Sequence, residues 1–105
     1  MLKKMPEIEL RVLFAAEASQ LFQIFKDQQR WPDDSILRLL VVRDPGFVQV
    51  SMIDRSRVSI TINSLGLGKC ELLLKHELIT SSQALEGHQK FWADYLEQVR
   101  KLVER

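Results

Sequence analysis

The last third of the chain, from Lys69 to Arg105, reads as one apolar strand followed by one long amphipathic helix. In its first part apolar side chains and one histidine alternate, which is typical of one buried strand face. These residues are Cys70, Leu72, Leu74, His76 and Leu78. Apolar side chains then recur at three- and four-residue spacing, which predicts a helix with one buried stripe. The stripe comprises Leu85, His88, Trp92, Tyr95, Leu96, Val99, Leu102 and Val103. Ser81 and Ser82 precede it and offer an N-cap. A helix of this length can cover a sheet, so the sequence favours one sheet packed against one helix.

The rest of the chain supplies further strands and one shorter helix. Alternating or apolar runs predict strands at Ile8–Phe14, Ile36–Arg43, Phe47–Ile53 and Val58–Ile62. A helical stripe runs from Glu17 to about Gln29, and Pro32 prevents its continuation. Asp44-Pro45-Gly46 predicts a turn in which Gly46 tolerates a positive φ. The segment from Asn63 to Gly68 reads as a glycine-containing loop.

The predicted order is therefore β-α-β-β-β-β-α, within one domain spanning residues 1–105. Four consecutive strands joined by short turns should pair as an antiparallel meander, and the first strand should complete the sheet at an edge. We expect an α+β fold in which a curved antiparallel sheet of about five strands wraps on the long C-terminal helix.

Composition narrows the classes of function. The chain has 15 basic and 14 acidic residues, with a formal net charge of +1, so we expect no nucleic-acid partner. Its single cysteine excludes an internal disulfide and favours a reducing, cytoplasmic location. Lys3 and Lys4 are followed by Pro6 and acidic residues, so we expect no signal peptide. The apolar runs are too short for membrane insertion.

Three segments resemble the START-like helix-grip (SRPBCC) superfamily, in the branch related to activators of the heat-shock protein 90 ATPase. The first is the strand–helix entry from Ile8 to Trp31. The second runs from Arg57 to Ile62, through a glycine loop, to Lys69 and the strand that ends at His76-Glu77. The third is the helix that carries Leu85, Trp92, Leu96 and Val99.

The resemblance covers nearly the whole chain and departs in the middle, where Trp31 leads almost directly into Ile36. The chain looks like a compact member, so any cavity between sheet and helix should be small. The resemblance implies a non-catalytic protein-interaction or regulatory module. The alternative is binding of a small hydrophobic ligand in that reduced cavity, for which residues of the stripe and strands are the candidates. These are Phe22, Phe25, Trp31, Met52, Leu74, His76, His88, Trp92 and Tyr95. An aromatic set at this spacing is more often plain core, and that interpretation is favoured here.

A third alternative is an enzyme of the cyclase or hydrolase type known on this fold, using His76 or His88 as acid or base. The sequence assembles no catalytic set. His76-Glu77 begins like a zinc-protease motif, but Thr80 stands where the second histidine is needed. Gly66-Leu67-Gly68-Lys69 lacks the remainder of a phosphate-binding loop. We therefore expect no catalytic residues, no metal ligands and no cofactor.

Apolar residues also alternate onto the face opposite the expected pocket, which predicts a homodimer or a protein partner on the outer sheet face. These are Leu37, Leu39, Val41, Leu73 and Ile79. Within the long helix, Gly87 predicts close packing or a slight bend.

Overall fold

The computed structural model describes residues 6–104 and has the predicted order of elements, with one short 3-10 helix added. Lys3 and Lys4 lie outside the described residues. The elements are β1 (Ile8–Phe14), α1 (Ala18–Phe25), η1 (Gln28–Arg30), β2 (Ile36–Arg43), β3 (Phe47–Met52), β4 (Arg57–Gly66), β5 (Lys69–Glu77) and α2 (Ser82–Val103).

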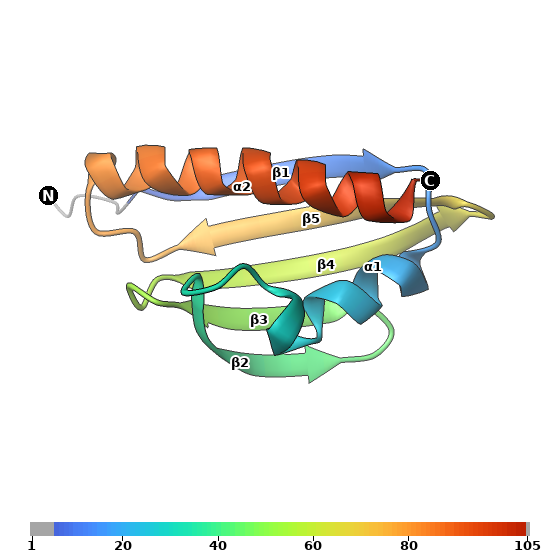
Figure 1. Ribbon diagram of the computed structural model, residues 1–105, viewed down its shortest axis with the longest axis horizontal. Coiled ribbons are helices and arrows are strands. Elements are labelled where there is room, and N and C mark those ends of the chain that lie inside the picture. Colours follow the sequence, from blue (N-terminus) through green and yellow to red (C-terminus); the bar gives the residue numbers. More distant parts are fainter. Residues whose placement is uncertain (1–5, 105) are drawn as a thin grey trace, which may run out of the picture.

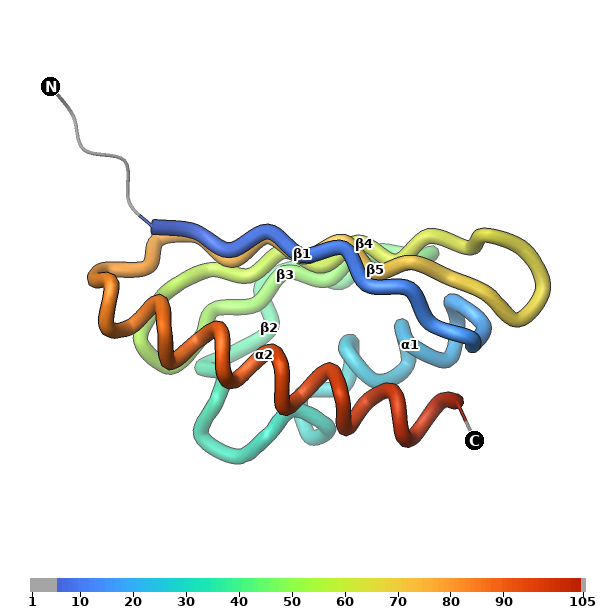
Figure 2. The backbone as a smooth tube through the Cα atoms, turned by 90° about the horizontal axis from the view of Figure 1, so that it is seen from above, coloured from blue at the N-terminus to red at the C-terminus, as the bar shows by residue number. Residues whose placement is uncertain are grey.

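The five strands form one antiparallel sheet in the order β1-β5-β4-β3-β2, so the meander and the edge position of β1 are both confirmed. Both helices lie on the same face of this curved sheet, with α2 running along β1 and α1 packed on β4 and β5 (Figures 1 and 2). The fold is therefore the α+β helix-grip arrangement, with the core between the sheet and the two helices.

The helix α2 begins at the predicted cap, because the Ser81 hydroxyl accepts a hydrogen bond from the Ala84 N–H at 3.0 Å. Its buried residues are Trp92, Tyr95, Leu96 and Val99. Leu102, predicted to belong to the stripe, is exposed because it lies at the flank of the stripe in the last turn. Gly87 has no neighbour within 4 Å of where a Cβ would stand, so the prediction of close packing there was wrong.

Several local predictions needed correction. The first helix ends at Phe25, and η1 follows it as a separate turn capped by Asp27, which accepts from the Gln29 N–H. Strand β4 extends to Gly66, so the predicted loop shrinks to Leu67 and Gly68, because the Asn63–Ser64 region continues to pair with β5. Gly46 does not have a positive φ.

The end of β5 also differs from the alternating pattern. The strand stops at Glu77, and Leu78 adopts a left-handed conformation with φ of 62°. This turn reverses the alternation, so that Leu78 is 41% exposed and Ile79 is fully buried in the core. Ile79 therefore does not belong to the outer face, where strict alternation had placed it.

Strand β2 corrects the predicted outer patch. The β2–β3 register shifts between Ile36 and Arg38 and again between Leu39 and Val41. As a result Leu39 pairs with the buried Val50 and packs against the core, while Leu37 and Leu40 are exposed. Of the predicted outer patch, Leu39 and Ile79 are therefore core residues. None of the helices within residues 6–104 is both long and apolar enough to cross a membrane.

Candidate functional site

The aromatic residues predicted to line a cavity pack against one another between α2 and the sheet. The Trp31 ring centroid lies 5.7 Å from that of Phe25, 5.9 Å from that of Trp92 and 5.3 Å from that of Tyr95. Such tilted and edge-to-face pairs stabilise a core beyond simple burial. The Trp31 indole N–H donates to the Phe25 carbonyl at 2.9 Å. This hydrogen bond holds the segment that follows α1 against the aromatic cluster. These four rings thus form one packed aromatic cluster between α2 and the sheet.

The other predicted pocket residues surround this cluster. Met52 of β3 and Leu74 of β5 are buried. Phe22 of α1 is also buried, and the Lys26 ammonium lies 5.3 Å from the centroid of its ring. His76 is fully buried and His88 stands beside it, with 4.2 Å between their ring centroids. The structure therefore brings the nine predicted residues into one contiguous region. Their role as ligand contacts stays a prediction.

The side chain of His76 is held on both of its ring nitrogens. The Trp92 indole N–H donates to Nδ1 at 3.0 Å, and the Ser56 hydroxyl oxygen lies 2.7 Å from Nε2. An indole N–H can only donate, so Nδ1 must be the acceptor and Nε2 must carry the proton. Nε2 then donates to Ser56, whose hydroxyl donates in turn to the Asp54 carboxylate.

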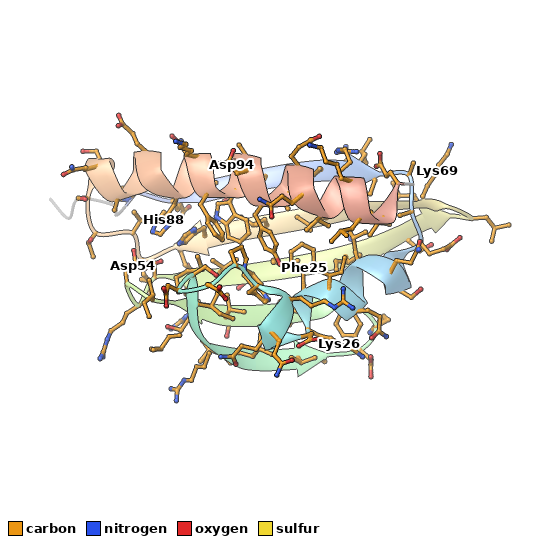
Figure 3. All side chains as sticks on the ribbon, viewed as in Figure 1. Phe25, Lys26, Asp54, Lys69, His88 and Asp94 are labelled. Carbon is orange, nitrogen blue, oxygen red and sulfur yellow. The ribbon has the colours of Figure 1, made fainter. Side chains whose placement is uncertain are left out.

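Asp54 connects this buried chain of hydrogen bonds to the second histidine. Its Oδ1 accepts from the Ser56 hydroxyl and backbone N–H, and its Oδ2 lies 2.8 Å from Nε2 of His88. Figure 3 shows His88 on α2 and Asp54 in the β3–β4 turn facing each other at one end of the molecule. The sequence analysis missed Ser56 and Asp54, because both lie in a polar turn without a motif. The Asp-x-Ser spacing, typical of an Asx turn, was the available signal.

The surroundings lower the pKa values of both His76 and Asp54, for different reasons. Burial and the neighbouring His88 lower the pKa of His76 to about 4, although the Asp54 carboxylate opposes this change. Burial tends to raise the pKa of Asp54, but hydrogen bonds from Ser56 and His88 outweigh it and lower that pKa to about 2. Burial raises the pKa of the Tyr95 hydroxyl, and burial together with Glu17 and Glu104 raises the pKa of the Cys70 thiol.

This geometry is unsuited to nucleophilic catalysis. A base that activates Ser56 would need a free lone pair on Nε2, whereas the Trp92 contact fixes the proton there. Ser56 is itself 1% exposed, and Cys70 is fully buried. Among residues 6–104, no three His, Cys, Asp or Glu side chains gather in a group suited to a metal ion.

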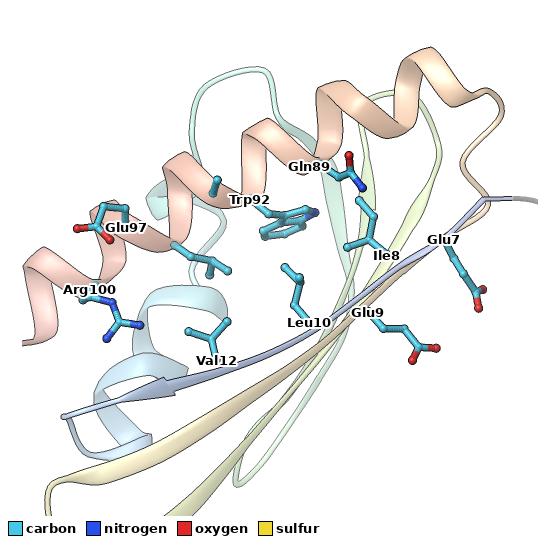
Figure 4. A pocket seen from close by; sticks show the side chains of 11 residues that line it. Glu7, Ile8, Glu9, Leu10, Val12, Gln89, Trp92, Glu97 and Arg100 are labelled. Carbon is cyan, nitrogen blue, oxygen red and sulfur yellow. The ribbon is translucent and has the colours of Figure 1, made fainter.

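A groove of about 520 Å³ lies at the surface, between β1 and α2. Ile8, Leu10 and Val12 approach it from the strand and Trp92 and Leu96 from the helix. Figure 4 shows these apolar side chains converging between the two elements, with Glu97 and Arg100 on the helix side. The groove lies between the sheet and the C-terminal helix, and it shares Trp92 with the predicted ligand set.

The sequence matches no protein-family model and no curated protein. The fold does match solved structures. A Chromobacterium violaceum protein superposes with a TM-score of 0.77 and 18% identity, covering 95% of this chain and 99% of that chain. The Aha1 dimer of Colwellia psychrerythraea superposes with a TM-score of 0.74 and 12% identity, covering 95% of this chain and 97% of that chain. The AHSA1-like protein of Rhizobium etli superposes with a TM-score of 0.67 and 20% identity, covering 95% of this chain and 84% of that chain. The chain therefore has the helix-grip fold of these structures.

Proposed function

We propose that the chain is a non-catalytic module of the activator-like branch of the helix-grip fold, which acts by binding a protein partner at its surface. The likeness to the Aha1-like structures supports a protein partner. The tautomer of His76, imposed by Trp92, supports the non-catalytic part of the proposal. It leaves the best-placed base in the molecule without a free lone pair.

The packing of the interior supports the same conclusion. Phe25, Trp31, Trp92 and Tyr95 contact one another between α2 and the sheet. Within the described residues, every buried side-chain nitrogen or oxygen has a hydrogen-bond partner, so none is left to recognise a bound molecule. This packing favours a function at the surface.

The direct test is the ATPase rate of a heat-shock protein 90 titrated with this chain, together with sedimentation of the mixture. We expect a co-sedimenting complex and a saturable rise in the ATPase rate. Absence of a complex at tens of micromolar would contradict the chaperone as partner. Turnover of an ester or cyclisable substrate that is lost in His76→Gln would contradict the non-catalytic assignment.

A second candidate function, binding of a small apolar ligand, is favoured by the groove between β1 and α2. Its test is a thermal shift with fatty acids and with an apolar fluorescent dye, using Ala93→Trp to fill the groove. Under the first proposal neither probe gives a saturable shift. A saturable shift in the wild type that Ala93→Trp removes would establish the second candidate instead.

We further propose that the module forms a homodimer through the β1–β5 half of the outer sheet face. Leu13 and Leu73 are 51% and 37% exposed on these neighbouring strands, and Leu65 shares a hollow with Leu13. Exposed apolar residues that gather in this way are typical of interfaces. The similar Colwellia psychrerythraea structure is that of a dimer. We expect a dimer in sedimentation that Leu13→Glu and Leu73→Lys convert to a monomer. A wild-type monomer at high micromolar concentration would refute this.

A further inference from the structure

Three arginines gather on the outer sheet face beside the β3–β4 turn. Arg38 of β2 pairs in register with Ser51 of β3, and Ser51 pairs with Arg57 of β4. Cross-strand partners point to the same face, so both guanidiniums flank the Ser51 hydroxyl. Arg55, from the turn, joins them, and the three line a hollow of about 260 Å³ together with Leu37 and Leu40.

The positive charge of this hollow is not compensated. Within residues 6–104 none of the three guanidiniums has an ion pair or a side-chain hydrogen bond. Asp54, the acid nearest in sequence, has both carboxylate oxygens engaged by Ser56 and His88. Glu77 lies opposite Arg57 in register without forming an ion pair with it. The arginines are therefore available to an external anion.

The backbone departs from regularity where it builds this hollow. Register shifts in β2 at Leu37 and Leu40 leave these side chains 45% and 39% exposed beside the guanidiniums. Arg55 adopts a left-handed conformation with φ of 71°, which is unfavourable for a residue with a Cβ. β-Bulges recur at strand edges where a side chain must be re-aimed. The result is an apolar margin on one side of a cationic hollow.

We propose that this hollow binds an acidic segment of the partner protein. Carboxylates engage Arg38, Arg55 and Arg57, and an adjacent apolar side chain of the partner packs on Leu37 and Leu40. The inference rests on the proposed function and supplies the chemistry of the partner. Arginine suits this role because its planar fork binds a carboxylate with two parallel hydrogen bonds.

The surroundings favour a protein over a nucleic acid. The chain carries 15 basic and 14 acidic residues, so the cationic surface is local rather than extended. Lys75 of β5 also lies on this face, but it stands opposite Glu9 in the β1–β5 register. Arg43, farther along β2, lies over the Phe47 ring at 5.5 Å. Apolar residues beside clustered arginines match a peptide in which Leu and Glu alternate better than a phosphate backbone.

The test is fluorescence anisotropy with a labelled peptide of Glu residues interrupted by single Leu residues. The control peptide has Gln in place of each Glu. We expect saturable binding of the acidic peptide alone, weakened about fivefold by Arg38→Gln or Arg57→Gln. The double variant should not bind, and ~1 M salt should abolish binding because it shortens the Debye length to ~3 Å. Lys101→Gln, which removes the same charge from α2, should bind as the wild type does.

The variants should unfold at the wild-type temperature, since all three arginines are exposed. Equal binding of both peptides, or tighter binding of a single-stranded oligonucleotide than of the acidic peptide, would overturn the inference. If the acidic peptide does not bind while the chaperone complex still forms, the inference fails and the proposed function stands. If the peptide binds through Arg38 and Arg57 but no chaperone complex forms, the acidic site stands and the chaperone assignment fails.

Discussion

The indole N–H of Trp92 donates to Nδ1 of His76 at 3.0 Å, and this contact determines the direction of a buried chain of hydrogen bonds. The donors run from Trp92 through His76 and Ser56 to the Asp54 carboxylate. The chain ties α2 to β5 and to the β3–β4 turn. His76, which the sequence offered as an acid or base only under the enzyme alternative, here links the helix to the sheet by hydrogen bonds.

Replacing Trp92 tests the packing and the hydrogen bond separately. Trp92→Phe keeps an aromatic ring but leaves Nδ1 of the buried His76 without a donor, which should cost about 1–3 kcal/mol of stability. Trp92→Ala adds a cavity and should cost about 3–5 kcal/mol. Urea denaturation gives both values. Phe91→Leu, on the partly exposed neighbour, should change stability far less. A Trp92→Ala protein that melts within a degree or two of the wild type would show that α2 is not the main cover of the sheet.

Stability should fall as the pH drops from about 6.5 to about 4. The pKa of His76 is about 4 in the folded state and 6.5 in its ordinary state, so the unfolded chain binds more protons throughout this window. This difference in the pKa of His76 contributes about 3 kcal/mol to the free energy of unfolding. The contribution is fully present above pH 6.5 and is lost below about pH 4. Below this window, protonation of Asp54, whose folded pKa is about 2, removes further stability.

The measurement is chemical denaturation across this pH range, paired with NMR titration of the histidine ring signals. His76→Gln should flatten the dependence of stability on pH between 4 and 6.5. The ring signals of His76 should remain those of a neutral imidazole down to about pH 5, since its pKa is about 4. Titration of the His76 ring near pH 6.5 would contradict the assignment of His76 as a buried, neutral imidazole.

Much of the fold followed from local pattern. The alternation within the strands correctly predicted the meander, and the three- and four-residue spacing correctly predicted α2 with its Ser81 cap. Both patterns depend on residues that are near one another in the sequence. The errors arose where one residue interrupts a period. Left-handed Leu78 exchanges the faces of Leu78 and Ile79, and two register shifts bring Leu39 into the core. A bulge is set by the neighbouring strand, which no single segment reveals.

The candidate sites were less predictable for the same reason. The aromatic stripe indicated which rings lie between helix and sheet, and the short middle of the chain predicted little room around them. Asp54, Ser56 and the arginine hollow join turns and strands that only the sheet register brings together. Charges on an exposed face carry no period of their own, so Arg38 and Arg57 looked like scattered basic residues.

Two glycines offer a matched pair of alanine substitutions with opposite expected signs. At Gly46 a Cβ would stand 2.5 Å from the Ile62 carbonyl oxygen, so Gly46→Ala should destabilise by about 1–3 kcal/mol. At Gly87 a Cβ meets nothing within 4 Å on an exposed helical face, so Gly87→Ala should stabilise by about 0.5–1 kcal/mol. Thermal denaturation distinguishes them. A loss of stability in Gly87→Ala would mean that the helix needs flexibility there.

Arg100 should hold the C-terminal end of α2 to the end of β1, just as the chain of hydrogen bonds through His76 holds the middle of α2 to β5. Its guanidinium donates to the Leu13 carbonyl at 3.0 Å, lies over the Phe14 ring at 4.7 Å and pairs with Glu104 at 2.6 Å. Glu104 in turn accepts from the Ala15 N–H at 2.8 Å, so the last turn of the helix is bound to the end of β1. Arg100→Ala should cost about 1.5–3 kcal/mol, because it removes a charged donor and its aromatic contact together.

Two control variants separate the effect of the Arg100 hydrogen bonds from the effect of its charge. Arg100→Lys keeps the charge but loses the fork that reaches Leu13 and Glu104 at once, so it should recover less than half of the lost stability. Lys101→Ala removes a neighbouring exposed charge and should change stability by less than about 0.5 kcal/mol. Amide exchange in the last turn of α2 should accelerate in Arg100→Ala alone. Equal stability of Arg100→Ala and Lys101→Ala would show that α2 is held by its apolar stripe without help from this arginine.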